Sequence, residues 1–258
     1  METLTNDVVR WLKEQGASVV GISNVERFEG APRGHHPCDF VHKAKSVITF
    51  GVALLHYALH WEGHLVNSEL VPLEHRKDLL QNYFYEQTGY SMVNDLLNRL
   101  ALRISSFLES RGYFSLFFPA TYEADVEQLI KRTIPSGRGL FSQRHAAVMA
   151  GLGEFGLNNV VVTHQYGPRI RFNSVITEAE LVPSALLAEK TCLGESCSIC
   201  VQNCPGAISL RHDFDPGAVW YVTPARTDIG TCRKLRNLQY CWGRCIKVCP
   251  VGEASSKR

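Results

Sequence analysis

The residues of this chain best able to do chemistry are the cysteines near its carboxyl end. Eight of its nine cysteines form two quartets with short internal spacings, and the last cysteine of each quartet precedes a proline, Pro205 or Pro250. The quartets are Cys192, Cys197, Cys200 and Cys204, followed by Cys232, Cys241, Cys245 and Cys249. Thiolates at these spacings can converge on one small volume, as an iron–sulfur cluster or a zinc ion requires.

The order of the cysteines favours two [4Fe–4S] clusters. In the bacterial ferredoxin pattern, three closely spaced cysteines hold one cluster, and the fourth, which precedes proline, reaches across to the other cluster. By that rule the expected ligand sets are Cys192, Cys197, Cys200 and Cys249 for one cluster, and Cys204, Cys232, Cys241 and Cys245 for the other. Two neighbouring clusters predict one-electron transfer and a redox function. Two zinc sites remain an alternative because C-x2-C pairs also occur in zinc ribbons, and the clusters could also be purely structural.

A second candidate site is the glycine-rich stretch MAGLGEFGLNN, residues 149–159. Gly151, Gly153 and Gly156 have the G-x-G-x-x-G spacing of a dinucleotide-binding turn. Such a turn follows a strand and opens a helix, whereas here a helical pattern precedes the glycines and a strand pattern follows them. This inverted order disfavours a dinucleotide. The glycines then indicate a close backbone approach in a helix-to-strand turn, where a ligand can also approach.

The same stretch resembles a segment of corrinoid-dependent reductive dehalogenases and of epoxyqueuosine reductases. The shared features are Gly-Leu-Gly-Glu-x-Gly-x-Asn, an apolar strand and Tyr-Gly-Pro-Arg-x-Arg, followed by the cysteine-rich tail, and the resemblance extends from about residue 40 to residue 250. It implies a nitroreductase-like domain that binds cobalamin in a base-off form, with the clusters delivering electrons to cobalt. A flavin (FMN) in the same pocket is a lesser alternative.

The resemblance also assigns residues to the corrinoid side of that pocket, and they are Gly151, Gly153, Gly156, Asn158, Tyr166, Gly167, Pro168 and Arg169. Glycines would let backbone amides approach the corrin amides, and Arg169 could bind an acyl amide or the nucleotide phosphate. The chain also departs from its relatives. Residues 135–145 contain no carboxylate where epoxyqueuosine reductases place a proton-donating aspartate, and Tyr90 is followed by Ser91 where they have Tyr-His.

Two larger features of these families are expected to be missing. The chain ends soon after Cys249, without the helical-repeat extension of epoxyqueuosine reductases, and it begins without the twin-arginine leader of respiratory dehalogenases. These departures leave the substrate open. They also keep a non-catalytic iron–sulfur electron carrier, or a protein that handles or reduces a corrinoid, as an alternative to a reductase.

Several other side chains could bind metal or donate a proton, although packing is an alternative for each. His56, His60 and His64 would share one face of a helix, and Cys38 follows His35 and His36 in a polar loop. The remaining candidates for a proton donor are Tyr122, Arg138, Arg144 and His145.

Hydrophobic patterning predicts the elements that position these groups. Helices are expected over 5–16, 89–113 and 140–150, strands over 17–23, 45–54 and 113–121, and a hairpin over 159–177. Helices interspersed with strands indicate an α/β (α+β) fold. We expect a nitroreductase-like corrinoid-binding domain over 1–185 and a ferredoxin-like domain with two clusters over 186–258.

Charge and hydropathy limit the partners. A net charge of +2, from 27 basic and 25 acidic residues, gives no strong field for binding nucleic acid. No apolar run approaches the roughly 18 to 20 residues that a membrane span needs, and no export signal is evident. We therefore expect a cytoplasmic oxidoreductase that receives electrons from a reduced ferredoxin or flavodoxin and acts on a small molecule. A homodimer is consistent with the expected fold.

Overall fold

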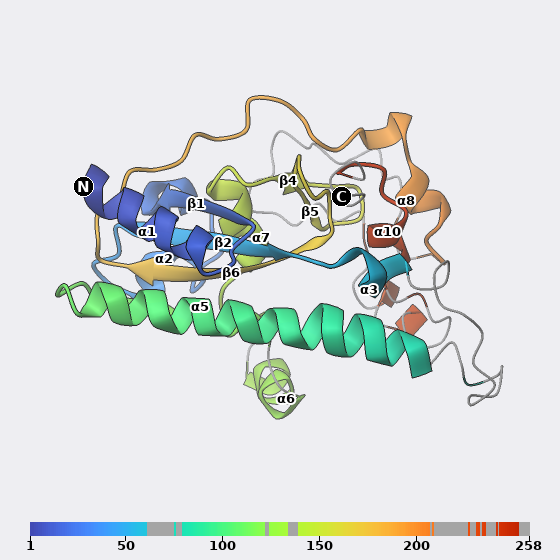
Figure 1. Cartoon of the computed structure of the whole chain (residues 1–258), viewed down its shortest axis with the longest axis horizontal. Helices are drawn as coiled ribbons and strands as arrows, with labels where there is room; N and C mark the ends of the chain where they lie inside the picture. Colours follow the sequence, from blue (N-terminus) through green and yellow to red (C-terminus); the bar gives the residue numbers. More distant parts are fainter. Residues whose placement is uncertain are drawn as a thin grey trace. The chain divides into compact units, whose positions relative to one another are not determined.

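The computed structural model divides into two compact units, which are assembled from alternating stretches of the chain (Figure 1). It describes residues 1–60, 75, 79–121, 124–133, 139–206, 208, 227, 231–232, 234–235, 241 and 243–252. The first unit comprises Met1–Val52, Asn94–Leu152 and Arg171–Leu186, and the second comprises Ala53–Val93, Gly153–Ile170 and Leu187–Arg258. The single domain boundary that we expect after residue 185 stays a prediction.

The first unit is built on a four-stranded sheet with the strand order β1-β2-β6-β3. β1 pairs antiparallel with β2, and β3 pairs antiparallel with β6. Because β2 and β6 occupy the two middle positions, both are buried along almost their whole length. The strands are β1 (Val19–Asn24), β2 (Ser46–Ala53), β3 (Ser115–Phe117) and β6 (Ile170–Thr177).

Helices lie on this sheet in the first unit, with α5 (Met92–Glu109) along one face and α7 (Gln143–Met149) on the other (Figure 1). α5 presents an apolar stripe because its apolar residues recur every three or four positions. Leu97, Ile104 and Leu108 of that stripe are fully buried, whereas Leu102 on the same helix is 57% exposed. The buried stripe of α5 and the middle strands together form the core.

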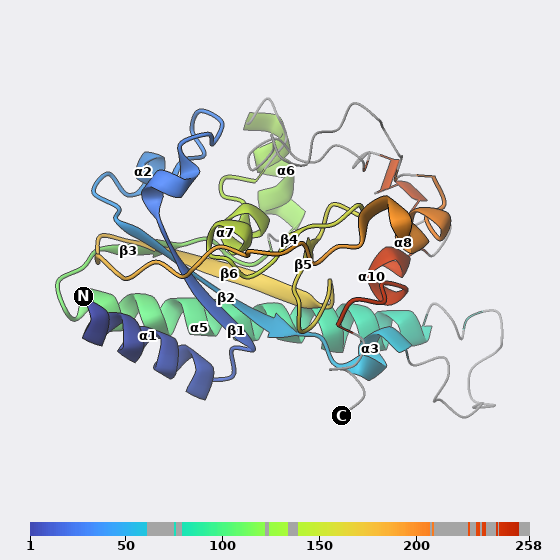
Figure 2. The ribbon, with the colours of Figure 1, turned by 90° about the horizontal axis from the view of Figure 1, so that it is seen from above.

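α1 (Glu2–Glu14) lies beside α5 (Figure 2). The guanidinium of Arg103 in α5 lies 5.2 Å from the centre of the Trp11 ring and donates a hydrogen bond to Gln15 Oε1 at 2.9 Å. Gly16 takes a φ of +105° directly after α1, as the expected helix end requires. The first unit also contains η1 (Val25–Phe28), α2 (Pro37–Phe40) and α6 (Ala124–Thr133).

The second unit consists of short elements. α3 (His56–His60) packs against the π-helix η3 (Asn82–Ser91), and α8 (Ile199–Gln202) packs against α10 (Arg244–Lys247). A two-stranded sheet pairs β4 (Glu154–Phe155) with β5 (Val161–Val162). A 3-10 turn, η4 (Gly194–Ser196), lies among the described residues of the cysteine-rich segment.

The hairpin expected over 159–177 is wrong. The turn itself exists, because Thr163 and Gly167 form an isolated bridge around it. The two flanking strands do not pair with each other: β5 pairs with β4, and β6 enters the four-stranded sheet. Alternation of apolar and polar residues indicates a strand but does not identify its partner. The other expected helices and strands are present with shifted ends, and the expected strand over 113–121 shrinks to three residues in β3.

Within the described residues, no helix combines the length and the apolar character that crossing a membrane requires.

Candidate functional site

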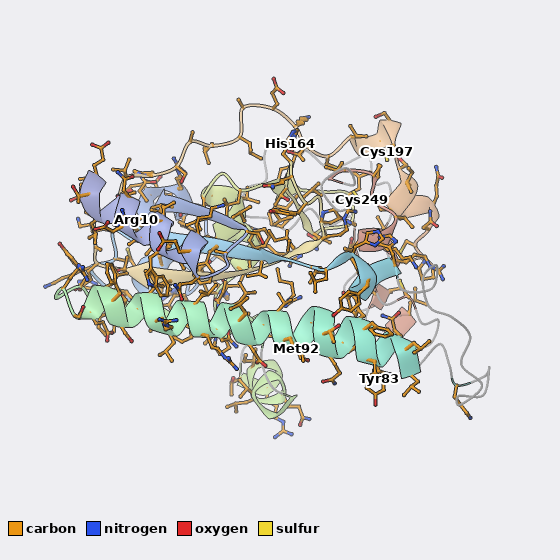
Figure 3. All side chains as sticks on the ribbon, in the orientation of Figure 1. Arg10, Tyr83, Met92, His164, Cys197 and Cys249 are labelled. Atoms are coloured by element: carbon orange, nitrogen blue, oxygen red, sulfur yellow. The ribbon has the colours of Figure 1, made fainter. Side chains whose placement is uncertain are left out.

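The eight cysteines predicted as cluster ligands all belong to the second unit, and none of them forms a disulfide. Cys200 lies on α8 and Cys245 on α10, so the packing of these two helices brings the two halves of the cysteine-rich sequence together. Figure 3 labels Cys197, from the first quartet, and Cys249, from the second.

The first expected set is brought together around Cys200. The pKa of Cys200 is raised to about 11, chiefly by burial and in addition by the charges of Cys192, Cys249 and Cys197. Burial also raises the pKa of Cys249, where Cys192 and Cys197 act in the same direction. The cysteine charges that act on Cys249 thus come from the first quartet, as the crossed ligand sets predict.

The second expected set is brought together around Cys245. The pKa of Cys245 is raised to about 12, chiefly by burial and in addition by the charges of Cys241, Cys232, Cys200 and Cys204. Because Cys200 of the first set also acts on Cys245, the two sets are neighbours. Two [4Fe–4S] clusters need eight thiolates in two sets of four, so the number of cysteines suffices, while their arrangement into two ligand sets stays a prediction.

The backbone around these thiols has the tight turns that a cluster-binding loop needs. Gly194, Ser198 and Gly243 all have left-handed φ values, of +63°, +48° and +78°. The Ile208 amide donates a hydrogen bond to Cys204 Sγ at 3.4 Å, and amide donors of this kind tune a cluster's reduction potential. Across the described part of the chain, no group of three or more His, Cys, Asp or Glu side chains is arranged to hold a metal ion. Cluster ligation by these cysteines stays a prediction.

Glu154, the acidic residue of the Gly-Leu-Gly-Glu sequence, contacts the start of the cysteine-rich segment. Its Oε1 accepts hydrogen bonds from the backbone amide of Thr191 and, at 2.6 Å, from that of Cys192. We did not predict this role. The signal was a carboxylate inside the glycine turn, but its partner lies almost 40 residues further along the chain and no local pattern identifies it.

Arg169 contacts the other end of the cysteine-rich segment. Its guanidinium donates hydrogen bonds to the carbonyl oxygen of Cys249 at 2.7 Å, to that of Ile246 at 3.4 Å and to that of Val251. The side chain is only 4% exposed. Gly167 has a φ of +56°, and a β-carbon there would collide with the Val251 carbonyl. The contact between Arg169 and a corrinoid stays a prediction, while the structure uses this side chain to hold the Cys249 loop.

Asn158, like Arg169, contacts the cysteine-rich segment. Its Nδ2 donates a hydrogen bond to the Cys245 carbonyl at 3.3 Å, and its Oδ1 accepts one from the Val160 amide at 3.3 Å. Pro168 is buried, whereas Tyr166 is half-buried. Of the side chains assigned to the corrinoid side, Tyr166 thus retains the most exposure.

The glycines of the turn are explained by packing within each unit. In the first unit, a β-carbon on Gly151, where φ is +71°, would collide with the Ala185 carbonyl. In the second unit, a β-carbon on Gly153 would lie 2.7 Å from the Val162 carbonyl oxygen, and one on Gly156 would lie 2.7 Å from Val162 Cγ2. A close backbone carbonyl therefore accounts for Gly151 and Gly153, and a close side chain accounts for Gly156. The contact of these glycines with a ligand stays a prediction. The turn follows α7 and precedes β5, which is the inverted order that the sequence indicates.

The histidine candidates have structural partners. His36 Nδ1 accepts a hydrogen bond from the Cys38 amide at 3.1 Å and caps α2, and its Nε2 lies 3.2 Å from the Val25 carbonyl oxygen. His35 Nδ1 lies 2.7 Å from the Leu140 carbonyl oxygen. Burial raises the pKa of the Cys38 thiol. These contacts explain the polar loop without a metal.

The rings of His56 and His60 stack with their centroids 4.4 Å apart on α3, but His64 lies outside the described residues. Of the candidate proton donors, Arg144 and His145 lie on α7. Ser142 caps that helix, and its Oγ lies 2.7 Å from His145 Nδ1. Tyr122 and Arg138 lie outside the described residues, so their roles stay predictions.

Comparison with known proteins finds reductases. A tetrachloroethene reductive dehalogenase from Desulfitobacterium hafniense is 31% identical over 120 residues, which cover 45% of this chain and 18% of that protein. An epoxyqueuosine reductase from Streptococcus thermophilus has a TM-score of 0.56 at 16% identity, covering 97% of this chain and 66% of that one. A catabolic reductive dehalogenase has a TM-score of 0.59 at 17% identity, covering 93% and 31%.

The chain has the fold of these reductases. The resemblance and the mixed α/β fold class predicted from the sequence are thereby confirmed. No family model matches the chain. The chain covers less than two thirds of the length of each of these proteins, and only 18% of the dehalogenase relative.

Another epoxyqueuosine reductase of this fold is bound to a tRNA stem loop. Its TM-score is 0.55 at 16% identity, covering 98% of this chain and 66% of that one. Our expectation that nucleic acid is not a partner therefore stays a prediction.

Proposed function

We propose that this chain is an iron–sulfur reductase that passes electrons through two [4Fe–4S] clusters to a bound corrinoid, which reduces a small-molecule substrate. The observation that supports this proposal is that the charges of Cys192, Cys197 and Cys249 act on Cys200, and that those of Cys204, Cys232 and Cys241 act on Cys245, as two crossed ligand sets would require. The fold likeness to reductive dehalogenases and epoxyqueuosine reductases supports it.

The clusters, when bound, would supply one-electron steps. The chain itself supplies the thiolates, the buried surroundings and an amide donor to Cys204 Sγ. The two sets are neighbours through Cys200 and Cys245, so an electron would travel only a short distance between them. A reduced ferredoxin or flavodoxin is the proposed electron donor, and a homodimer is the proposed assembly.

The fold supports the proposal that a corrinoid binds, whereas the side chains assigned to the corrinoid give it less support. Asn158 and Arg169 donate to carbonyls of the segment that carries Cys245 and Cys249. The space beside Gly151, Gly153 and Gly156 is filled by the chain. We therefore derive no step through the corrinoid at these residues. This observation favours the second candidate, an iron–sulfur electron carrier or a protein that handles a corrinoid without catalysing substrate reduction. FMN is a lesser alternative.

The test is anaerobic purification followed by analysis of iron, sulfide, cobalt and zinc, with a visible spectrum before and after incubation with cobalamin. About eight irons per chain together with bound cobalt would support the reductase. About eight irons without cobalamin uptake would favour the carrier. Zinc without sulfide would contradict both.

A further inference from the structure

We propose that Glu154 and Arg169 are positioning residues for one of the two clusters, the one expected on Cys192, Cys197, Cys200 and Cys249. Glu154 holds the first of these cysteines and Arg169 holds the last. The inference rests on the proposed function, because the cluster itself is part of that proposal.

Glu154 fixes the backbone at the start of the ligand set. Its carboxylate oxygen Oε1 accepts from the amides of both Thr191 and Cys192. Hydrogen bonds to a charged group are stronger than those between neutral groups. Two such bonds to adjacent amides fix the backbone from which the Cys192 side chain extends.

Arg169 fixes the end of the same set. Three carbonyls, those of Ile246, Cys249 and Val251, accept from one buried guanidinium. The planar fork of an arginine suits this arrangement, because it presents several N–H groups in fixed directions. A lysine presents a single nitrogen, so it does not reproduce the separate bonds that Nη1 and Nη2 of Arg169 make. Arg169 therefore ties together three carbonyls of the loop around Cys249.

Both residues belong to one stretch of the second unit, Gly153–Ile170, which lies outside the cysteine-rich sequence. That stretch thus positions two cysteines that are far apart in the chain. It also places a negative charge near one end of the set and a positive charge near the other. A buried positive charge favours the reduced, more negative cluster, and a negative charge disfavours it.

The two opposite charges give a test that simple loosening would not mimic. In redox titrations followed by EPR, Arg169→Gln should lower the midpoint potential of one cluster and Glu154→Gln should raise that of the same cluster. A shift of about 59 mV would correspond to a tenfold change in the reduction equilibrium. The matched controls are Glu195→Gln and Arg244→Gln, which remove exposed charges close in sequence to cysteines and should shift the potentials less.

A second measurement uses the metal-free chain. Glu154→Ala should speed hydrogen exchange at the amides of Thr191 and Cys192 by roughly tenfold or more, because their acceptor is lost. Arg169→Lys keeps the charge but not the planar fork. It should therefore not show the fall in midpoint potential that is expected for Arg169→Gln, while it should still loosen the Cys249 loop. Unchanged exchange, or potentials that move in the same direction in both Gln variants, would overturn the proposal. If the anaerobically purified chain contains no iron and Glu154→Ala still speeds exchange at Thr191 and Cys192, the proposed function is contradicted and the positioning role of Glu154 stands.

Discussion

The metal-free chain should hold protons on its buried thiols to unusually high pH. Burial, with neighbouring cysteines acting in the same direction, raises the pKa of Cys200 to about 11 and that of Cys245 to about 12. At pH 8, thiolate then forms in about one Cys200 in a thousand and about one Cys245 in ten thousand, against about one in ten for a thiol at the ordinary value of 9.0.

Alkylation with iodoacetamide, followed for each peptide by mass spectrometry across pH, measures these values because the thiolate is the reacting species. The midpoint of each pH profile reports the pKa, whereas poor access lowers the rate without moving the midpoint. Cys249→Ala should lower the midpoint of Cys200, because Cys249 is one of the groups that raise it, and should leave Cys245 unchanged. Midpoints near 9 for both thiols in the folded chain, or a change at Cys245 instead of Cys200, would refute the grouping.

The same pKa values predict how stability depends on pH. The unfolded chain releases these protons near pH 9.0, and the folded chain keeps them until about pH 11 or 12. In this window the unfolded state binds fewer protons, so the free energy of unfolding falls as pH rises above about 9. Thermal unfolding of the metal-free chain at pH 7.5 and pH 10 measures the change. A higher melting temperature at pH 10 would contradict the prediction.

Two substitutions test the packing that holds the site. Gly167→Ala should cost more than the roughly 1–2 kcal/mol of a left-handed conformation, because its β-carbon would collide with the Val251 carbonyl. Gly34→Ala is the control, since Gly34 has a φ of +80° and no atom within 4 Å of the added carbon; equal losses in thermal unfolding would show that the collision is relieved. Leu97→Ala should cost about 2–5 kcal/mol in urea unfolding, and Leu102→Ala on the exposed face should cost less than about 0.5 kcal/mol. Similar costs for both leucines would mean that α5 packs through a different face.

The local features of the site could be predicted from the sequence, and its long-range partners could not. Cysteine spacing predicts the two ligand sets because the ligand rule for neighbouring clusters depends on short loops and on the proline that follows the fourth cysteine. The order of elements around Gly151 is also a local feature. A helix precedes the glycines and a strand follows them, which disfavours a dinucleotide-binding turn. The partner of Arg169 lies 80 residues away at Cys249, and nothing in the residues around Arg169 distinguishes a phosphate from a set of carbonyls.

The predicted hairpin is wrong for a related reason. β6 follows the turn at Gly167 directly, and its alternating residues would suit pairing with β5 equally well. Burial along almost its full length places β6 in the middle of the sheet, and that burial depends on β2, β3 and the helices that cover them. Sequence reasoning therefore identifies the elements, while tertiary packing decides which strands pair.

The most direct test of the two crossed ligand sets is quantitative iron and sulfide analysis, with EPR of the reduced protein, on the anaerobically purified chain and its Cys249→Ser variant. The unchanged chain should contain about eight irons and show two interacting clusters. The variant should retain about four irons, on the set formed by Cys204, Cys232, Cys241 and Cys245. The two crossed ligand sets would be contradicted if the variant instead loses the cluster on Cys204, Cys232, Cys241 and Cys245. They would also be contradicted if the unchanged chain carries zinc and no sulfide.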